Sequence, residues 1–493
     1  MATPSAMSQS RGKVPESKGL IGGQYQPLSP SSIERIHQAS LEIFAEVGFE
    51  VHYGGALEIF AQSGAKVDFD KKHVRLSPQL VEKAIGTAPS NVVLYGREDR
   101  HNLTLEGKRV YLGTGGTAIN VLDLETGEKR LSNLEDVRQI AKLVDALDNI
   151  HFFLLPVFPN ELPQEQVDVN RFYAALSNTT KHVTGGVWHR EGARNAIKLA
   201  SIIAGGYEEL KKRPIISMIC CVVSPLKLDK HYTELMMIVA ENGIPVMVPS
   251  EALCGATSPV TLAGDVLQVN VETLAGVILT QLVNPGTPVV YGTVSTIADP
   301  RRMSYTSGAV EMGLINAAVA QMAQFYHLPC YATAGMSDSK LPDVQAGYEK
   351  AITSLLVALA GANYIHDAAG LLEFAMTAAY EQYVIDDEIN GMVMRAVRGM
   401  ECNEDSLALD VIKNVGSTRN FFDQSHTVKH LRTEFFFPKL SDRLPREEWL
   451  QKGGKDARER AREIAKGILV NHKPIPIPPE IDSKIRETIP GLV

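Results

Sequence analysis

The fold is decided by stretches such as Ile215-Ile216-Ser217-Met218-Ile219-Cys220-Cys221, in which apolar residues follow one another with almost no polar alternation. This pattern is typical of a strand that is buried on both faces of a parallel sheet. From about residue 109 onward the chain contains eight such runs. The other seven runs are 110–113, 151–155, 182–185, 245–248, 288–291, 328–332 and 362–366.

Long segments that favour helices separate these runs, and several of them are rich in alanine. Eight strand–helix repeats within about 290 residues predict an α/β fold, a (β/α)8 TIM barrel over residues 109–400. A doubly wound open sheet is the alternative, and it usually carries a GxGxxG loop before its first helix. Gly113-Thr114-Gly115-Gly116 departs from that fingerprint, because residues 118–123 favour a strand or hairpin.

Segments of different character flank the barrel. Residues 30–108 predict an N-terminal α+β unit, with a capping box at Ser31 and Glu34 opening its first helix. Residues 1–29 are predicted to be a flexible tail, with a partner-binding arm as the alternative. Residues 401–493 predict a C-terminal helical and Pro-rich arm packed on the barrel, with a helix near 446–467.

Composition narrows the range of functions and locations. The net charge is −8, from 49 basic and 57 acidic side chains, so the chain lacks the basic footprint of a nucleic-acid-binding protein. Five cysteines without CxxC spacing predict a reducing compartment, the cytoplasm. No apolar run approaches the ~20 residues of a membrane span, so no membrane association is expected. The long Ala-rich helices suggest a homo-oligomer.

In a TIM barrel the active site lies just beyond the carboxyl ends of the strands, and this rule selects the candidate residues. Aromatic faces are good partners for a quaternary ammonium ion, and a carboxylate adds complementary charge. The polar candidates are His189, Glu251 and His366, and the aromatic candidates are Phe158, Trp188, Tyr291 and Phe374. Simple packing of the aromatic side chains at the barrel mouth is an equally open interpretation.

Two other chemistries receive less support. His189 and His366 with Glu251 or Asp367 lack the HxH or HExxH spacing of a metal site, so no metal is predicted. Lys340 follows the seventh strand and is a candidate Schiff-base lysine of an aldolase-type barrel, although nothing nearby in the sequence would depress its pKa.

The loop after the seventh strand carries a specific resemblance to a known protein family. Residues 334–350, AGMSDSKLPDVQAGYEK, resemble the trimethylamine:corrinoid methyltransferase family, and so do Gly185-Gly186-Val187 and residues 285–292, PGTPVVYG. The likeness extends from about residue 30 to 470. The family fold is a (β/α)8 barrel, in agreement with the count of strands.

The resemblance implies a substrate class. Archaeal trimethylamine enzymes of the family carry pyrrolysine, whereas this chain has only standard residues, and we expect the corresponding position near Lys340. Pyrrolysine-free relatives are implied to demethylate quaternary amines such as glycine betaine, proline betaine, carnitine or γ-butyrobetaine. The pair His366-Asp367 is similar to betaine-type members, so glycine betaine is the first choice.

The resemblance also implies a mechanism. The methyl acceptor is cob(I)alamin on a separate corrinoid protein, and no cofactor is expected to bind tightly to this chain. His366 and Glu251 are expected to act as polar catalytic groups, and Trp188, Tyr291 and Phe374 as the ammonium cage. Phe158 and His189 are expected beside the cage, with Tyr95 of the N-terminal unit closing over the mouth. A non-catalytic betaine-binding barrel is the alternative.

Overall fold

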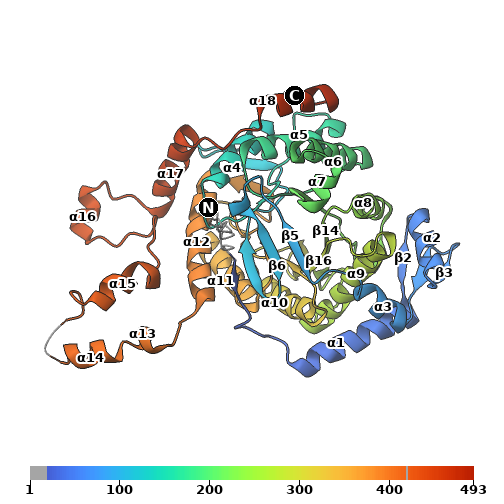
Figure 1. Cartoon of the computed structure of the whole chain (residues 1–493), viewed down its shortest axis with the longest axis horizontal. Helices are drawn as coiled ribbons and strands as arrows, with labels where there is room; N and C mark the ends of the chain where they lie inside the picture. Colours follow the sequence, from blue (N-terminus) through green and yellow to red (C-terminus); the bar gives the residue numbers. More distant parts are fainter. Residues whose placement is uncertain (1–18, 418–419) are drawn as a thin grey trace, which may run out of the picture.

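A closed barrel of eight parallel strands forms the centre of the computed structural model, which describes residues 19–417 and 420–493 (Figure 1). Neighbouring strands pair in parallel around the barrel, and a parallel bridge between Gly113 and Phe152 completes the circle. Each of the eight predicted runs overlaps one barrel strand, so the predicted TIM barrel is confirmed. The strands are β7 (Arg109–Leu112), β10 (Phe153–Leu154), β11 (Val183–Gly186), β12 (Ile216–Ile219), β14 (Val246–Ser250), β16 (Val289–Thr293), β19 (Cys330–Thr333) and β20 (Tyr364–His366).

Long helices surround the barrel and bury the outer faces of its strands (Figure 1). Local signals set their ends: the side chain of Asp343 caps the first turn of α11, and Gly361 ends that helix with a left-handed backbone at φ 85°. The main helices are α4 (Leu134–Asp145), α5 (Gln164–Asn178), α6 (Arg190–Ala204), α8 (Lys230–Glu241), α9 (Leu262–Val283), α10 (Val310–Phe325), α11 (Val344–Ala360) and α12 (Tyr380–Arg398).

The N-terminal α+β unit packs against the outer side of α9. Its helices are α1 (Pro30–Glu42), α2 (Gly54–Gln62) and α3 (Pro78–Ile85), and its strands β2 (Phe49–Val51), β3 (Lys66–Asp68) and β4 (His73–Arg75) form a small sheet. The first helix begins earlier than predicted, because Ser29 rather than Ser31 caps it and Pro30 takes the first turn.

Helix α9 is the one helix among the described residues that is long and apolar enough to cross a membrane. In this fold 78% of its apolar window is buried between the barrel and the N-terminal unit. A helix covered on both sides needs no polar face, which accounts for its composition.

A two-stranded hairpin closes the amino end of the barrel. It consists of β5 (Asn91–Leu94) and β6 (Leu103–Glu106), and its apolar side chains pack with Tyr111, Phe152 and Tyr364 from the barrel interior. Figure 1 shows the hairpin lying across the middle of the barrel. Tyr95, which follows β5, donates its backbone amide to the carbonyl of Pro214, just before β12 begins. The interior therefore opens toward the carboxyl ends of the strands.

The chain ends are arranged differently from the expected tail and arm. Residues 1–18 lie outside the described residues, but β1 (Leu20–Ile21) pairs antiparallel with β7 and is not a loose tail. Helices α13 (Glu404–Leu407), α14 (Leu409–Val415), α15 (Ser425–Glu434) and α16 (Arg446–Gln451) extend away from the barrel (Figure 1).

The last two helices return to the barrel. Helix α17 (Ala457–Asn471) packs on α12 and α4, and α18 (Pro479–Thr488) packs on α6. The single helix expected near 446–467 is interrupted, because Gly453 and Gly454 both adopt positive φ angles of 100° and 62°.

Candidate active site at the carboxyl ends of the barrel strands

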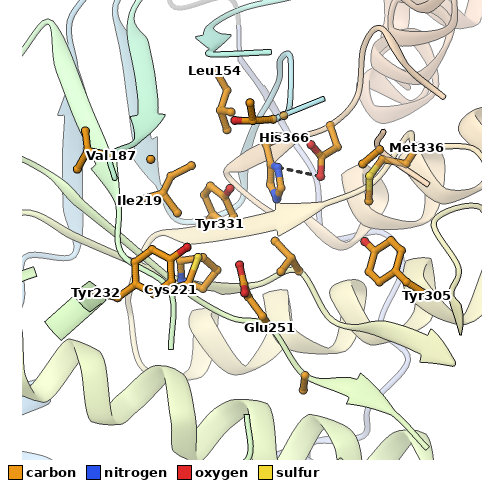
Figure 2. A pocket seen from close by; sticks show the side chains of 18 of the residues that line it. Leu154, Val187, Ile219, Cys221, Tyr232, Glu251, Tyr305, Tyr331, Met336 and His366 are labelled. Atoms are coloured by element: carbon orange, nitrogen blue, oxygen red, sulfur yellow. Dashed lines mark ion pairs between the residues drawn. The ribbon is translucent and has the colours of Figure 1, made fainter. Parts of the chain in front are cut away.

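One cavity of about 630 Å³ lies at the carboxyl ends of the strands, where a TIM barrel carries its active site. Its lining comes from β10, β11, β12, β14, β19 and β20, from the loops that follow most barrel strands, including β7 and β16, and from α5 and α8. Figure 2 shows side chains converging on this space from several elements. The polar and aromatic members are Thr117, Arg171, Trp188, Cys221, Tyr232, Glu251, Thr257, Tyr305, Tyr331, His366 and Asp367.

Glu251 follows β14 and points its carboxyl group into the cavity (Figure 2). Solvent in the cavity reaches the side chain, but protein surrounds it closely, and this burial raises the pKa of Glu251. The thiol of Cys221 is hydrogen-bonded to Glu251, and burial beside that carboxyl raises the pKa of the thiol well above its usual value. Cys221 is therefore a thiol donor to Glu251, which is one of the two carboxyl groups in the cavity lining, with Asp367.

Four aromatic side chains surround the same space. Trp188 follows β11 and is 43% exposed at the rim, while Tyr331 is buried on β19. Tyr232 and Tyr305 lie on different sides of the cavity, with Glu251 between them in Figure 2. Aromatic faces around a carboxylate form an environment suited to a cation whose charge is spread over methyl groups.

His366 and Asp367 form the polar end of β20. The Nδ1 atom of His366 lies 3.0 Å from Oδ2 of Asp367, and the same oxygen accepts a 2.6 Å hydrogen bond from Thr333 Oγ1. The His366 ring also stacks on Tyr331, with ring centroids 4.2 Å apart. These contacts hold the imidazole in one orientation on the cavity wall.

Arg171 is the only lysine or arginine among the cavity-lining residues. It lies on α5 with 1% of its surface exposed, and its Nη2 donates to Thr117 Oγ1 at 2.8 Å and to the carbonyl of Leu155 at 3.2 Å. Burial lowers the pKa of Arg171 to about 10, against a smaller opposing effect of Asp168. The guanidinium is therefore still charged at neutral pH.

Two predicted cage residues lie elsewhere. Tyr291 is fully buried but points outward from β16, where its hydroxyl donates a 2.6 Å hydrogen bond to Asn270 on α9. Side chains alternate along a strand, and on β16 Val290 is the residue that faces the barrel interior. The Phe374 ring stays near the mouth but lies 4.5 Å beneath the Lys340 ammonium, outside the cavity lining.

The expectation for Tyr95 is wrong. Tyr95 directly follows β5 at the closed end of the barrel. Its carbonyl oxygen is hydrogen-bonded to the ring of His182, just before β11. It therefore lies at the opposite end from the cavity and does not close over the mouth. The hairpin covers the amino ends of the strands because its apolar residues fill the barrel interior there.

The remaining candidates lie at or near the rim. Phe158 packs edge-on against Trp188, with ring centroids 6.0 Å apart, but does not line the cavity. His189 is exposed at the start of α6 and also lies outside the lining. Lys340 is exposed, donates to the carbonyl of Asp338 and does not reach the cavity, so it lacks the desolvated setting of a Schiff-base lysine.

Sequence reasoning missed Arg171, Cys221, Tyr232, Tyr305 and Tyr331 as site residues. Cys221 carries a local signal, because Ile219 and Cys221 are two residues apart and both line the cavity. Arg171 and Tyr232 lie on helices, so the rule that selects loop residues after strands could not find them.

Comparison with known proteins identifies the family. The family described as trimethylamine methyltransferase (MTTB) matches residues 4–490. The chain is 40% identical over 477 residues to trimethylamine methyltransferase MttB of Desulfitobacterium hafniense (strain DSM 10664 / DCB-2), covering 96% of this chain and 94% of that protein. It is 34% identical over 472 residues to glycine betaine methyltransferase of D. hafniense (strain Y51), covering 96% and 98%.

A solved structure supports the fold independently. The monomethylamine methyltransferase MtmB of Methanosarcina barkeri superimposes with a TM-score of 0.53 at 14% identity, covering 91% of this chain and 90% of that one. The extent of the sequence matches, together with the barrel and its cavity, leads to one conclusion: this chain is a methyltransferase and belongs to the trimethylamine methyltransferase family.

Proposed function

We propose that this chain transfers a methyl group from a quaternary amine, with glycine betaine as the first candidate, to the cob(I)alamin of a separate corrinoid protein. The observation that carries the proposal is the cavity in which Trp188, Tyr232, Tyr305 and Tyr331 surround the carboxyl group of Glu251. The relative named glycine betaine methyltransferase supports the choice of substrate.

The cavity residues have simple tasks in this reaction. The aromatic faces hold the trimethylammonium group, each worth about 0.5–2 kcal/mol. The C–N bond breaks with its electron pair left on nitrogen, so dimethylglycine leaves as a neutral amine and no proton is needed. Attraction to the aromatic faces and to Glu251 fades as the positive charge disappears, so these groups bind substrate and do not drive the reaction. The acceleration of methyl transfer must therefore come from positioning one methyl group for attack.

The corrinoid supplies the nucleophile when its carrier protein docks. The geometry of this chain suits that arrangement, because the cavity opens at the carboxyl end beside the exposed Trp188. His366, held by Tyr331 and Asp367, is a fixed polar group on the cavity wall that can orient the substrate. We expect no tightly bound cofactor on this chain.

Trimethylamine is the second candidate substrate, because relatives at 36–40% identity are named trimethylamine methyltransferases. Proline betaine, carnitine and γ-butyrobetaine are further alternatives with the same trimethyl- or dimethylammonium chemistry.

A substrate panel tests the proposal. Purified protein is mixed with its cognate corrinoid protein, reduced to cob(I)alamin, and with each amine in turn, and methylation is followed in the visible spectrum. Glycine betaine should react fastest, and the other product should be dimethylglycine. Reaction with trimethylamine alone would overturn the substrate, whereas binding of glycine betaine without transfer would identify a binding protein.

We also propose that the protein works in the cytoplasm as a homo-oligomer. Side chains on successive turns of α11, Val344, Tyr348 and Ile352, form an exposed apolar stripe. The segment from Met400 to α16 exposes many more, including Met400 and Phe422 at 92% and 88%. Light scattering should give a mass above one chain, and Tyr348→Glu with Ile352→Glu should reduce it. A monomeric wild-type protein would contradict the proposal.

A further inference from the structure

Arg171 is a buried cation that lacks a carboxylate partner. Among the described residues, no carboxylate oxygen lies within 4 Å of its guanidinium, and its Nε atom is buried without any hydrogen-bond partner. Asp168, one helical turn earlier on α5, uses one oxygen to accept from the Trp188 amide, and its other oxygen is also buried with no hydrogen-bond partner in the described part of the chain. A buried arginine without a direct partner is costly, which points to an anion that arrives with a ligand.

The position of Arg171 within the cavity matters as much as its burial. Arg171 and its hydrogen-bond partner Thr117 both line the cavity, together with Gly116. Glu251 lines the same cavity from the loop after β14. Asp367 is the other carboxyl group in the lining, but it already contacts His366 and Thr333. The wall therefore offers a ligand one cationic group, Arg171, and one acidic group, Glu251, at separate positions, which is the pattern that a zwitterion requires.

We propose that Arg171, oriented by Thr117, binds the carboxylate of a zwitterionic substrate, while the aromatic side chains and Glu251 hold its trimethylammonium group. This inference rests on the proposed function and refines it: the substrate is a betaine, and simple amines such as trimethylamine and choline lack the group that Arg171 binds. Arginine suits the task because its planar guanidinium can donate two parallel hydrogen bonds to one carboxylate.

Binding measurements without corrinoid test the inference on the wild-type protein first. The ligands are glycine betaine and its primary amide, which keeps the trimethylammonium group and the shape but replaces the charged carboxylate. By calorimetry we expect glycine betaine to bind about ten- to one-hundredfold more tightly than the amide. Equal affinities would overturn the inference without any variant.

Variants then assign the effect to Arg171. In Arg171→Gln the preference for glycine betaine over the amide should disappear, because the acid binds more weakly and the amide binds as before. Arg171→Lys should restore part of the preference, and Thr117→Val should reduce it by a smaller factor. If Arg171 has a purely structural role, its substitution should weaken the binding of both ligands equally, and that result would overturn the assignment to Arg171.

The two proposals fail in different ways. If the wild-type protein neither binds nor demethylates glycine betaine, the proposed substrate is wrong. If it demethylates glycine betaine while Arg171→Gln keeps the acid-over-amide preference, the methyl transfer stands and only the role of Arg171 falls. If Arg171→Gln fails to fold, the inference is still tested by the affinities of glycine betaine and its amide for the wild-type protein and for Thr117→Val.

Discussion

The ring of His366 stacks on the ring of Tyr331, with centroids 4.2 Å apart and planes inclined by 26°. The two residues lie on neighbouring strands of the barrel, because β19 pairs directly with β20. Both side chains line the cavity, and neither ring nitrogen of His366 has a hydrogen-bond partner among the described residues, although Nδ1 lies 3.0 Å from Asp367 Oδ2. The imidazole is thus fixed by ring contact and by Asp367, while one nitrogen remains for a ligand.

His366→Ala should lower kcat by about ten- to one-hundredfold, because loss of a fixed contact lets the reacting methyl group move away from its productive position. The melting temperature should change little in comparison. Steady-state rates with glycine betaine and the corrinoid protein measure the effect, and His366→Gln should recover part of it. A rise in KM with unchanged kcat would show instead that His366 only binds substrate.

Trp188→Ala should weaken binding of glycine betaine by roughly two- to thirtyfold, the range expected for one aromatic face on an ammonium ion. Trp188→Phe should lose less. Tyr291→Phe is the matched control: it removes the 2.6 Å hydrogen bond to Asn270 outside the cavity and should cost about 1 kcal/mol of stability with no change in affinity. Calorimetric affinities that rank Tyr291 above Trp188 would refute the location of the cage.

The affinity for glycine betaine should rise with pH as Glu251 ionises. Burial raises the pKa of this carboxyl, so it stays neutral at pH values where an ordinary glutamic acid is charged. Below the raised pKa the neutral group attracts the ammonium weakly, and above it the full charge is present. The transition should therefore lie above the ordinary value of 4.5. Dissociation constants measured from about pH 5 to 8 test this, and in Glu251→Gln the profile should be flat.

Lys350→Met should destabilise the protein by about 3–5 kcal/mol, because it leaves Asp386 as a buried charge without its partner. Lys350 Nζ lies 3.0 Å from Asp386 Oδ2 and also donates to the carbonyl of Gly335, next to the cavity residue Met336. The melting temperature measures the loss. The double variant Lys350→Met with Asp386→Leu should recover much of it, and an equally unstable double variant would contradict the explanation.

The barrel was predictable because its strands are buried on both faces, and such strands leave a continuous apolar run in the sequence. The direction of a side chain was not predictable in the same way. Tyr291 and Tyr331 occupy similar positions in their runs, yet one faces the helices and the other the cavity. Register around the closed barrel decides between these directions, and it depends on all eight strands together.

The sequence also could not predict which end of the barrel the β5–β6 hairpin covers. Nothing near Tyr95 indicates whether the hairpin lies at the mouth or at the base, because both ends offer apolar surface. Arg171 was missed for a related reason. An arginine on an amphipathic helix normally points to solvent, and only the packing of α5 against the barrel turns this one inward.

The hairpin has a kinetic consequence. Because the apolar side chains of the hairpin fill the amino end of the barrel, the described residues leave the cavity open at the carboxyl end, where the amine and the corrinoid protein would both approach. A docked corrinoid protein would cover the open end of the cavity. The amine therefore has to bind first, and its demethylated product can leave only after the corrinoid protein has dissociated. We therefore expect compulsory-order kinetics, in which excess corrinoid protein inhibits by trapping enzyme that has not yet taken up its amine.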